Sequence, residues 1–352
     1  MMSASDKLPL LIVGLRFGRY LIDRILAGEE GDGIRVAAVC DRDAALVQRT
    51  AAELAVPGFE RLEDALTDPR LPVAALFTPP AGRADLIRLC LRAGKDVITT
   101  KPFELDPKAA EEVLQEARRL GRVVQVNSPS PQPSDVVRME TWIRDYDLGR
   151  PVAARAEMLT NVQEQADGSW YDDPLRCPLA PVFRLGIYAI NDLVRLFGPA
   201  SQVFAQGERL RTGRPTPDQG QLAIRFRSGG LASVFATFCC DDGDRYLNSL
   251  LLHCERGTIY RNLDPAMPWR PASGSSARLS LVMGDGAQRR LIATEEVAPR
   301  SGEYPWREFA DAIAGRRPLD AAGIATIVEG IRVVAAMAES DRTGAAVNLP
   351  LA

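Results

Sequence analysis

The 352-residue sequence contains a single histidine, His253. One imidazole excludes a metal site built from several histidines and leaves few routes for histidine catalysis. Cysteine is also sparse, since the six residues form no C-x-x-C pair and follow no regular spacing. This usage favours reduced, mostly buried thiols in a cytoplasmic protein, and we predict no metal site.

The sequence also lacks a strong charge bias and a long apolar run near its start. Lys and Arg number 43 against 46 Asp and Glu, a formal net charge of −3, which argues against a nucleic-acid binder or a membrane-surface protein. The first apolar run, residues 10–15, is far shorter than the ~18 residues of a membrane span. It follows no basic segment, so we expect no signal peptide. With 46% hydrophobic and 25% charged residues, the composition is that of a soluble globular protein.

Strand-like and helix-like patterns alternate over the first part of the chain. Short apolar runs predict buried strands at residues 10–13, 36–40, 73–77, 97–98 and 123–126, with helical spacing between them. This alternation predicts an α/β domain with a doubly wound parallel sheet of the Rossmann type. The carboxyl ends of its strands share one edge, where a ligand would bind.

The pattern changes after residue 127. Longer alternating runs predict an open, mostly antiparallel sheet, at 152–158, 221–226, 231–237, 247–253 and 279–282. Helices are predicted over 182–197 and near 306–314 and 324–338. We therefore predict two domains, 1–127 and an α+β domain over 128–352, and leave open whether the C-terminal helices pack back on the first. Because an exposed apolar sheet face needs covering, we expect a homodimer or homotetramer through it.

The first strand runs into a glycine turn and then a helix, an arrangement that holds a dinucleotide pyrophosphate at a helix amino end. The usual G-x-G-x-x-G is shortened here, because Gly14 and Gly18 enclose only Leu15, Arg16 and Phe17. The turn predicts a cofactor site, with a purely structural turn as the alternative.

Asp41 strengthens the cofactor hypothesis. It ends the second strand, 27 positions after Gly14, where an acid accepts hydrogen bonds from an adenosine ribose. A carboxylate there favours NAD, since it repels a 2′-phosphate. Arg42 beside it would instead receive such a phosphate and keeps NADP open. A helix-entry turn is the alternative role for Asp41.

Lys101 follows the fourth strand at the same predicted sheet edge. A lysine next to the nicotinamide would donate a hydrogen bond to a substrate oxygen and polarise it during hydride transfer. A surface lysine without a role is the alternative.

Several segments together resemble the Gfo/Idh/MocA family of nicotinamide-dependent dehydrogenases. The similarity is carried, in the family's order, by FTPP at 77–80, AGKDV at 93–97, KP at 101–102, GRVVQVN at 121–127, LGRPV at 148–152 and FADAIAG at 309–315. The resemblance implies a Rossmann fold, a small-molecule substrate and NAD or NADP bound by the glycine turn, Asp41, Arg42, Thr78, Pro79 and Lys101.

The stretch FRLGIYAINDL at 183–193 departs from the family's usual pattern, which has Asp at the position of Arg184 and His at that of Tyr188. Tyrosine there resembles the glucose-fructose oxidoreductase and dihydrodiol dehydrogenase branch, so the resemblance assigns catalysis to Lys101 and Tyr188. In an α-helix Arg184, Tyr188 and Asn191 share one face, and we expect Arg184 and Asn191 to bind substrate. Arg184 offers a fork for an anion, with a structural ion pair as the alternative.

The sequence therefore predicts an NAD(P)-dependent oxidoreductase acting on a small polar molecule, first of all a sugar or cyclic polyol derivative. The shortened turn followed by Tyr20 and Leu21 also resembles thiazolinyl imine reductases, which reduce a carbon–nitrogen double bond. The replaced Asp and His keep a third hypothesis open, a regulatory homologue that binds cofactor without catalysis. Arg83, where the family often has His, is a further departure.

Overall fold

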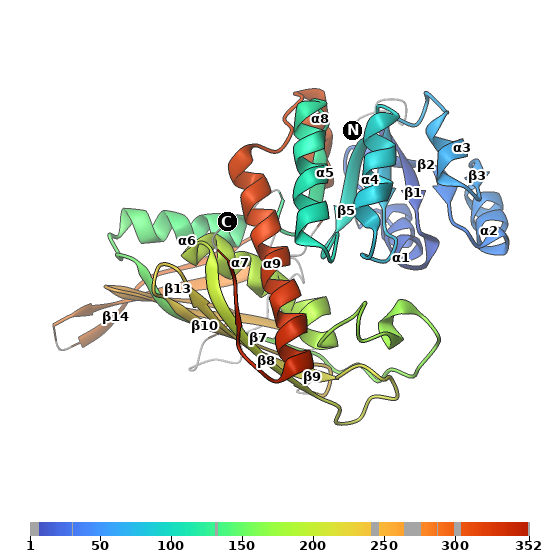
Figure 1. Cartoon of the computed structure of the whole chain (residues 1–352). Coiled ribbons are helices and arrows are strands. Elements are labelled where there is room, and N and C mark those ends of the chain that lie inside the picture. Colours follow the sequence, from blue (N-terminus) through green and yellow to red (C-terminus); the bar gives the residue numbers. More distant parts are fainter. Residues whose placement is uncertain are drawn as a thin grey trace. The chain divides into compact units, whose positions relative to one another are not determined.

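Two units make up the chain (Figure 1). The computed structural model describes residues 7–29, 31–130, 133–240, 246–263, 276–286, 288–298 and 304–350. The first unit comprises Met1–Pro131 with Tyr304–Ala325, and the second comprises Gln132–Glu303 with Thr326–Ala352.

The first unit contains a six-stranded parallel sheet with strand order β3-β2-β1-β4-β5-β6. The strands are β1 Leu8–Val13, β2 Ile34–Cys40, β3 Gly58–Phe59, β4 Val73–Leu76, β5 Asp96–Thr100 and β6 Val124–Asn127. The helices are α1 Leu15–Leu26, α2 Ala44–Leu54, α3 Leu62–Leu66, α4 Arg83–Arg92, α5 Pro107–Arg119 and α8 Trp306–Ala314. The predicted doubly wound parallel sheet is confirmed.

Local sequence explains where these elements begin. Asp43 and Asp106 cap α2 and α5, because their carboxylates accept hydrogen bonds from the first-turn amides of Leu46 and Lys108. The apolar runs of β1 and β4 are buried in one core, which Trp306 of α8 also enters. In this unit β3 and α3 were not predicted, because two and five residues are too short to show a period.

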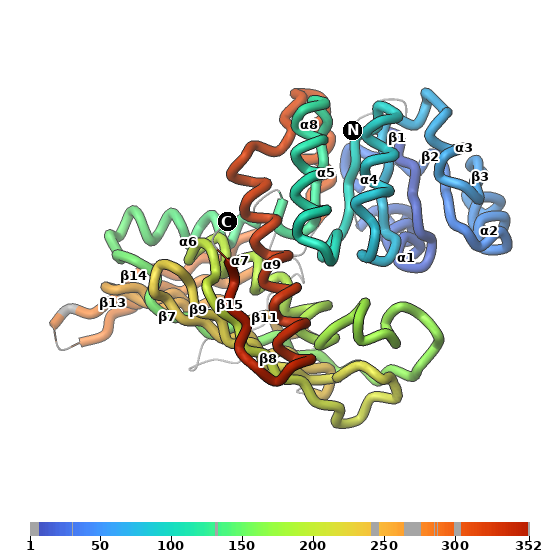
Figure 2. The backbone as a smooth tube through the Cα atoms, in the orientation of Figure 1, coloured from blue at the N-terminus to red at the C-terminus, as the bar shows by residue number. Residues whose placement is uncertain are grey.

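The second unit contains a nine-stranded sheet with strand order β14-β13-β12-β11-β7-β10-β9-β8-β15. All neighbours are antiparallel except β7 and β10. The strands are β7 Pro151–Leu159, β8 Ala200–Glu208, β9 Gln219–Phe226, β10 Leu231–Thr237, β11 Leu247–Cys254, β12 Gly257–Arg261, β13 Ala277–Asp285, β14 Gln288–Val297 and β15 Val347–Asn348. Figure 2 shows β15 running beside β8 at the red end of the chain. The predicted mostly antiparallel sheet is thus confirmed.

Helices α6 (Ser134–Asp145), α7 (Ile187–Phe197) and α9 (Ala321–Thr343) are the remaining long helices of the described chain. By length and hydropathy α9 alone, among described helices, would pass for a membrane span. Its Val333, Val334 and Met337 are fully buried, however, as in a core helix. In Figure 1, α6, α7 and the part of α9 in this unit lie on one side of the sheet.

One predicted element needs correction. The expected continuous α-helix over 182–197 begins with a π-helical turn, Val182–Gly186, and becomes α-helical only at Ile187. A π turn is wider than an α turn, so this segment is not one continuous α-helix as the sequence pattern predicts.

Candidate active site

The turn after β1 requires glycine. Gly14 has φ +90°, and a β-carbon on it would lie 2.8–2.9 Å from backbone atoms of Phe77 and Thr78 at the end of β4. Both the conformation and the close approach therefore exclude other residues. The Gly14 amide donates to Cys40 O at 2.9 Å, which ties the turn to the end of β2.

Gly18 lets α1 pack closely on the sheet, because a β-carbon there would lie 2.9 Å from Ile12 Cγ2. Between the two glycines, the side chains of Arg16 and Phe17 are exposed. The Phe17 ring meets Phe77 edge-on, with ring centroids 5.9 Å apart. The shortened glycine sequence thus still forms a tight strand–turn–helix with the first turn of α1 at the sheet edge.

Asp41 lies at the end of β2 and joins two neighbouring segments. Its Oδ2 accepts from the amide of Leu15, the first residue of α1, at 2.7 Å. Its Oδ1 accepts from the Asp43 amide at 3.0 Å. Asp41 therefore fixes the start of α1 and the entry to α2. This is the helix-entry role that was the alternative to ribose binding. Each carboxylate oxygen keeps a second lone pair for a ribose hydroxyl. Arg42 is exposed beside it.

Thr78 and Lys101 follow the neighbouring strands β4 and β5. The Thr78 hydroxyl oxygen is buried without a hydrogen-bond partner among the described residues, and Pro79 after it is exposed. The Lys101 side chain is half-buried, and its amide donates to Asn127 O at the end of β6 at 2.8 Å. In the order β2, β1, β4, β5, the carboxyl ends thus carry Asp41, Gly14, Thr78 and Lys101 along one edge.

In the second unit, Tyr188 and Asn191 lie in the first turns of α7. Tyr188 is half-buried, whereas Asn191 is 3% exposed. A β-carbon on Gly330 of α9 would lie 2.3 Å from Asn191 Oδ1, so α7 and α9 pack closely at this point. Four residues beyond Asn191 on α7, Arg195 pairs with Glu140 of α6 at 2.6 Å.

Arg184 in the π-helical turn forms the ion pair that sequence analysis held as the alternative. Its two terminal nitrogens donate to the two carboxylate oxygens of Glu164 at 2.7 and 2.8 Å. The guanidinium carbon lies 4.3 Å from the ring centroid of Tyr171 and 4.7 Å from that of Phe238. Arg214, 8% exposed, donates to the same carboxylate at 2.9 Å.

Glu164 is therefore held between two cations. Burial raises the pKa of its carboxyl, but Arg184 and Arg214 outweigh burial and hold that pKa below its ordinary value. Glu164 and Tyr171 were not predicted from the sequence, because Glu164 lies in an irregular segment and Tyr171 in a three-residue 3-10 turn, Trp170–Asp172, and neither shows a period.

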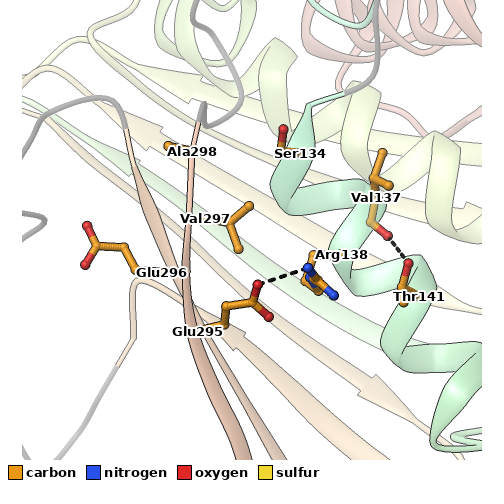
Figure 3. A pocket seen from close by; sticks show the side chains of 8 residues that line it. All are labelled: Ser134, Val137, Arg138, Thr141, Glu295, Glu296, Val297 and Ala298. Carbon is orange, nitrogen blue, oxygen red and sulfur yellow. Dashed lines mark hydrogen bonds and ion pairs between the residues drawn. The ribbon is translucent and has the colours of Figure 1, made fainter.

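The pocket in Figure 3 lies between α6 and β14 of the second unit. Its lining includes an ion pair of Arg138 with Glu295 at 3.0 Å, and none of the predicted site residues contributes to it. Among the described residues no group of three His, Cys, Asp or Glu is arranged to hold a metal ion.

Comparisons with known proteins agree with the fold of the two units. The family model for the oxidoreductase family with an NAD-binding Rossmann fold matches residues 8–128. The model for the GFO/IDH/MocA C-terminal domain matches residues 136–260.

Curated relatives cover part of the chain. An uncharacterized oxidoreductase of Schizosaccharomyces pombe is 25% identical over 49% of the chain and 47% of its own length. The chain thus spans about half of that relative. Trans-1,2-dihydrobenzene-1,2-diol dehydrogenase of Bos taurus is 25% identical over 67% of the chain and 68% of its own length.

Among solved structures, levoglucosan dehydrogenase in complex with NADH and L-sorbose superposes with a TM-score of 0.73. The match covers 98% of this chain and 99% of that one at 17% identity. The fold is therefore shared over nearly the whole chain. The chain belongs to the GFO/IDH/MocA oxidoreductase family, whose members are NAD(P)-dependent oxidoreductases and whose amino-terminal domain is an NAD-binding Rossmann fold.

Proposed function

We propose that the protein transfers hydride between NAD and a small, uncharged, polar substrate, a sugar or cyclic polyol derivative. The observation that carries this proposal is the sheet edge of the first unit, where Asp41, Gly14, Thr78 and Lys101 follow adjacent strands. In the strand order 3-2-1-4-5-6 successive strands are added on one side of β1 up to β3 and on its other side from β4 onward, and open α/β sheets bind their ligands at this switch point between β1 and β4.

The residues at this edge fit NAD. Asp41 already accepts from the Leu15 amide, so the following first-turn amides of α1, those of Arg16 and Phe17, would bind the pyrophosphate, and Gly14 has no side chain to cap them. Asp41 would accept from the adenosine ribose, and the Thr78 hydroxyl, which has no partner in the part of the chain that the structure describes, lies at the same edge. Arg16, Phe17, Gly18, Arg42 and Pro79 complete the proposed cofactor residues. Bound NAD supplies the group that accepts or donates the hydride.

Lys101 and Tyr188 are the proposed catalytic residues. The Lys101 ammonium would donate a hydrogen bond to the reacting oxygen, and the Tyr188 hydroxyl would give or take its proton. Asn191 would orient the substrate. In this proposal the first unit binds cofactor, and the second binds substrate and forms the oligomer contact.

Arg184 favours an uncharged substrate. The positive charge of Arg184 is already paired with the carboxylate of Glu164, so an anionic substrate would gain little from it. We therefore propose that Arg184 contributes to the substrate site by holding the segment that carries Glu164 and Tyr171. The complex of levoglucosan dehydrogenase with L-sorbose supports a polyhydroxylated ligand for this fold.

We also propose that the protein is a cytoplasmic homodimer or homotetramer that pairs through the sheet face opposite α6 and α7. Phe235 of β10 and Leu251 of β11 are half-buried on this face, and Leu231 is 55% exposed there. A second copy would cover these side chains.

A titration of protein fluorescence with NADH and NADPH, followed by a substrate panel, tests the function. We expect micromolar binding of NADH, weaker binding of NADPH, and turnover of sugars or polyols. Turnover only of cyclic imines would support imine reduction instead. Cofactor binding without turnover would support a regulator, and binding of neither cofactor would overturn the proposal.

A further inference from the structure

Arg83, the first residue of α4, is a buried arginine whose partners surround the Lys101 turn. Its side chain is 2% exposed. Nη1 donates to Thr100 O at 2.7 Å and to Pro102 O at 3.1 Å, the carbonyls on either side of Lys101. Nη2 donates to Thr78 O at the end of β4. One guanidinium thus joins the two segments that follow β4 and β5.

Glu104 makes the reciprocal connection. It lies three residues after Lys101, is 3% exposed, and accepts from the amide of Ala84 at 2.9 Å and from that of Leu105 at 2.7 Å. Arg83 therefore reaches from α4 to the Lys101 turn, and Glu104 reaches from that turn back to the start of α4. We call these two residues with their backbone partners the α4 clasp.

The α4 clasp fixes the backbone on both sides of Lys101. A further hydrogen bond, from the Lys101 amide to Asn127 O at 2.8 Å, holds the same turn against the end of β6. Burying a guanidinium is costly unless its donors are satisfied, and its planar fork reaches several carbonyls at once in a way that an ammonium does not. The chemistry of this position therefore favours arginine specifically.

We propose that Arg83 and Glu104 are positioning residues that set where the Lys101 amine stands at the cofactor edge. This inference rests on the catalytic role proposed for Lys101, but its structural part is testable without substrate. Removing the guanidinium leaves the Thr100 and Pro102 carbonyls without their donor, so the turn loosens and the amine loses its fixed direction.

The test uses the scarcity of lysine. The sequence has four, Lys7, Lys95, Lys101 and Lys108. Trace labelling with acetic anhydride, followed by mass spectrometry, gives the reactivity of Lys101 relative to Lys108, whose side chain is 84% exposed. The ratio, followed against pH, reports the environment of the Lys101 amine directly.

We expect Arg83→Met to raise the Lys101-to-Lys108 labelling ratio severalfold and to shift its pH profile, with Arg83→Lys intermediate and Glu104→Gln changed in the same direction. Arg88→Met is the matched control, since Arg88 lies on the same helix but pairs with Glu116 at 3.1 Å and Asp85 at 2.6 Å. It should leave the ratio unchanged. If Arg83→Met does not fold, Arg83→Lys and Glu104→Gln carry the test.

Unchanged ratios in folded Arg83 and Glu104 variants would overturn the α4 clasp as a positioning device. With an identified substrate, Arg83→Lys should lower kcat by about 100-fold with little change in KM, as expected when a catalytic group is misplaced by ~1 Å. Failure of the wild-type protein to bind NADH would overturn the proposed function instead, because the labelling ratio needs no cofactor.

Discussion

Tyr188 is the single residue on which the proposed proton transfer depends. Tyr188→Phe removes the hydroxyl and keeps the ring, so turnover should fall by at least about 100-fold, the usual effect of losing a general acid or base. NADH affinity should change little, since the proposed cofactor residues lie in the first unit. Steady-state kinetics and an NADH titration measure both quantities. Tyr260→Phe, which removes a hydroxyl paired with Arg289 at 2.6 Å, is the control, and full activity of Tyr188→Phe would refute the assignment.

Residues differ in how far sequence analysis could place them. The position of Asp41 beside the glycine turn was predictable, because a strand–turn–helix pattern sets the end of β2 next to that of β1. The bond from the Leu15 amide was not, since it depends on side-chain direction. The pairing of Arg184 with Glu164 joins residues 20 positions apart through an irregular segment. An ion pair of Arg184 was therefore predictable as an alternative, but its partner was not.

The segment that carries Glu164 gives a prediction about pH. The pKa of Glu164 is lowered in the folded protein, so the unfolded state binds more protons near its ordinary value of about 4.3. The ionised Glu164 carboxylate therefore contributes its full stabilisation of the folded state above that pH. This contribution is lost as the pH falls through the lower pKa of the folded protein. Glu164→Gln should destabilise the protein most near pH 7, and the difference from wild type should shrink below about pH 4.

Urea unfolding of both proteins at several pH values measures that difference. Groups common to wild type and variant cancel, so the trend belongs to Glu164. Glu208→Gln, at an exposed position on β8, is the control and should give a small difference at every pH. If the difference in unfolding free energy between wild type and Glu164→Gln stayed constant from pH 7 to pH 3, the lowered pKa of Glu164 would be contradicted.

The contact between α7 and α9 gives an element-scale prediction. Ala in a helix interior is ordinarily more stable than Gly by roughly 0.5–1 kcal/mol. In Gly330→Ala the new β-carbon would lie 2.3 Å from Asn191 Oδ1, and such overpacking typically costs about 1–3 kcal/mol. The variant should therefore be destabilised by about 1–2 kcal/mol in urea unfolding.

The double variant separates the two effects. In an Asn191→Ala background the obstruction is gone, so Gly330→Ala should become neutral or stabilising. A stabilising effect of Gly330→Ala in the wild-type background would mean that the helices move apart at little cost.

Elements were predictable where their apolar pattern is clear, not simply where they are long, since β8 and β14 are among the longest strands and were not predicted. The apolar runs of β1 and β4 and the alternation along β9 and β10 mark these strands, because buried and exposed residues repeat with the period of the structure. The π-helical turn was not predictable. It widens one turn of the backbone without interrupting the apolar character of the segment, so the sequence pattern reads as one α-helix.

At the scale of the whole molecule, the open sheet face in the second unit determines the proposed assembly. Along β10, Ala232, Val234 and Ala236 point to the buried side, so Leu231 and Phe235 lie on the other. The alternation of apolar and polar residues along the strands predicted that an open face exists. That pattern does not distinguish a face covered by a helix of this chain from one covered by a second copy. Figure 1 draws α6 and α7 on the buried side.

If a second copy covers this face, a charge placed there should separate the subunits. Leu251 lies on β11, two strands from Phe235, and Leu251→Arg would bury an unpaired guanidinium at the contact, which costs several kcal/mol per site. Light scattering during gel filtration at micromolar concentration should give a multiple of 38.3 kDa for the wild type and the monomer mass for the variant.

Leu175→Arg is the control, because Leu175 is 78% exposed and lies outside the strands. If a helix of the same chain covered this face, Leu251→Arg would unfold the protein. An unchanged circular dichroism spectrum of the variant would therefore indicate a contact between subunits. A monomeric wild type would refute the assembly.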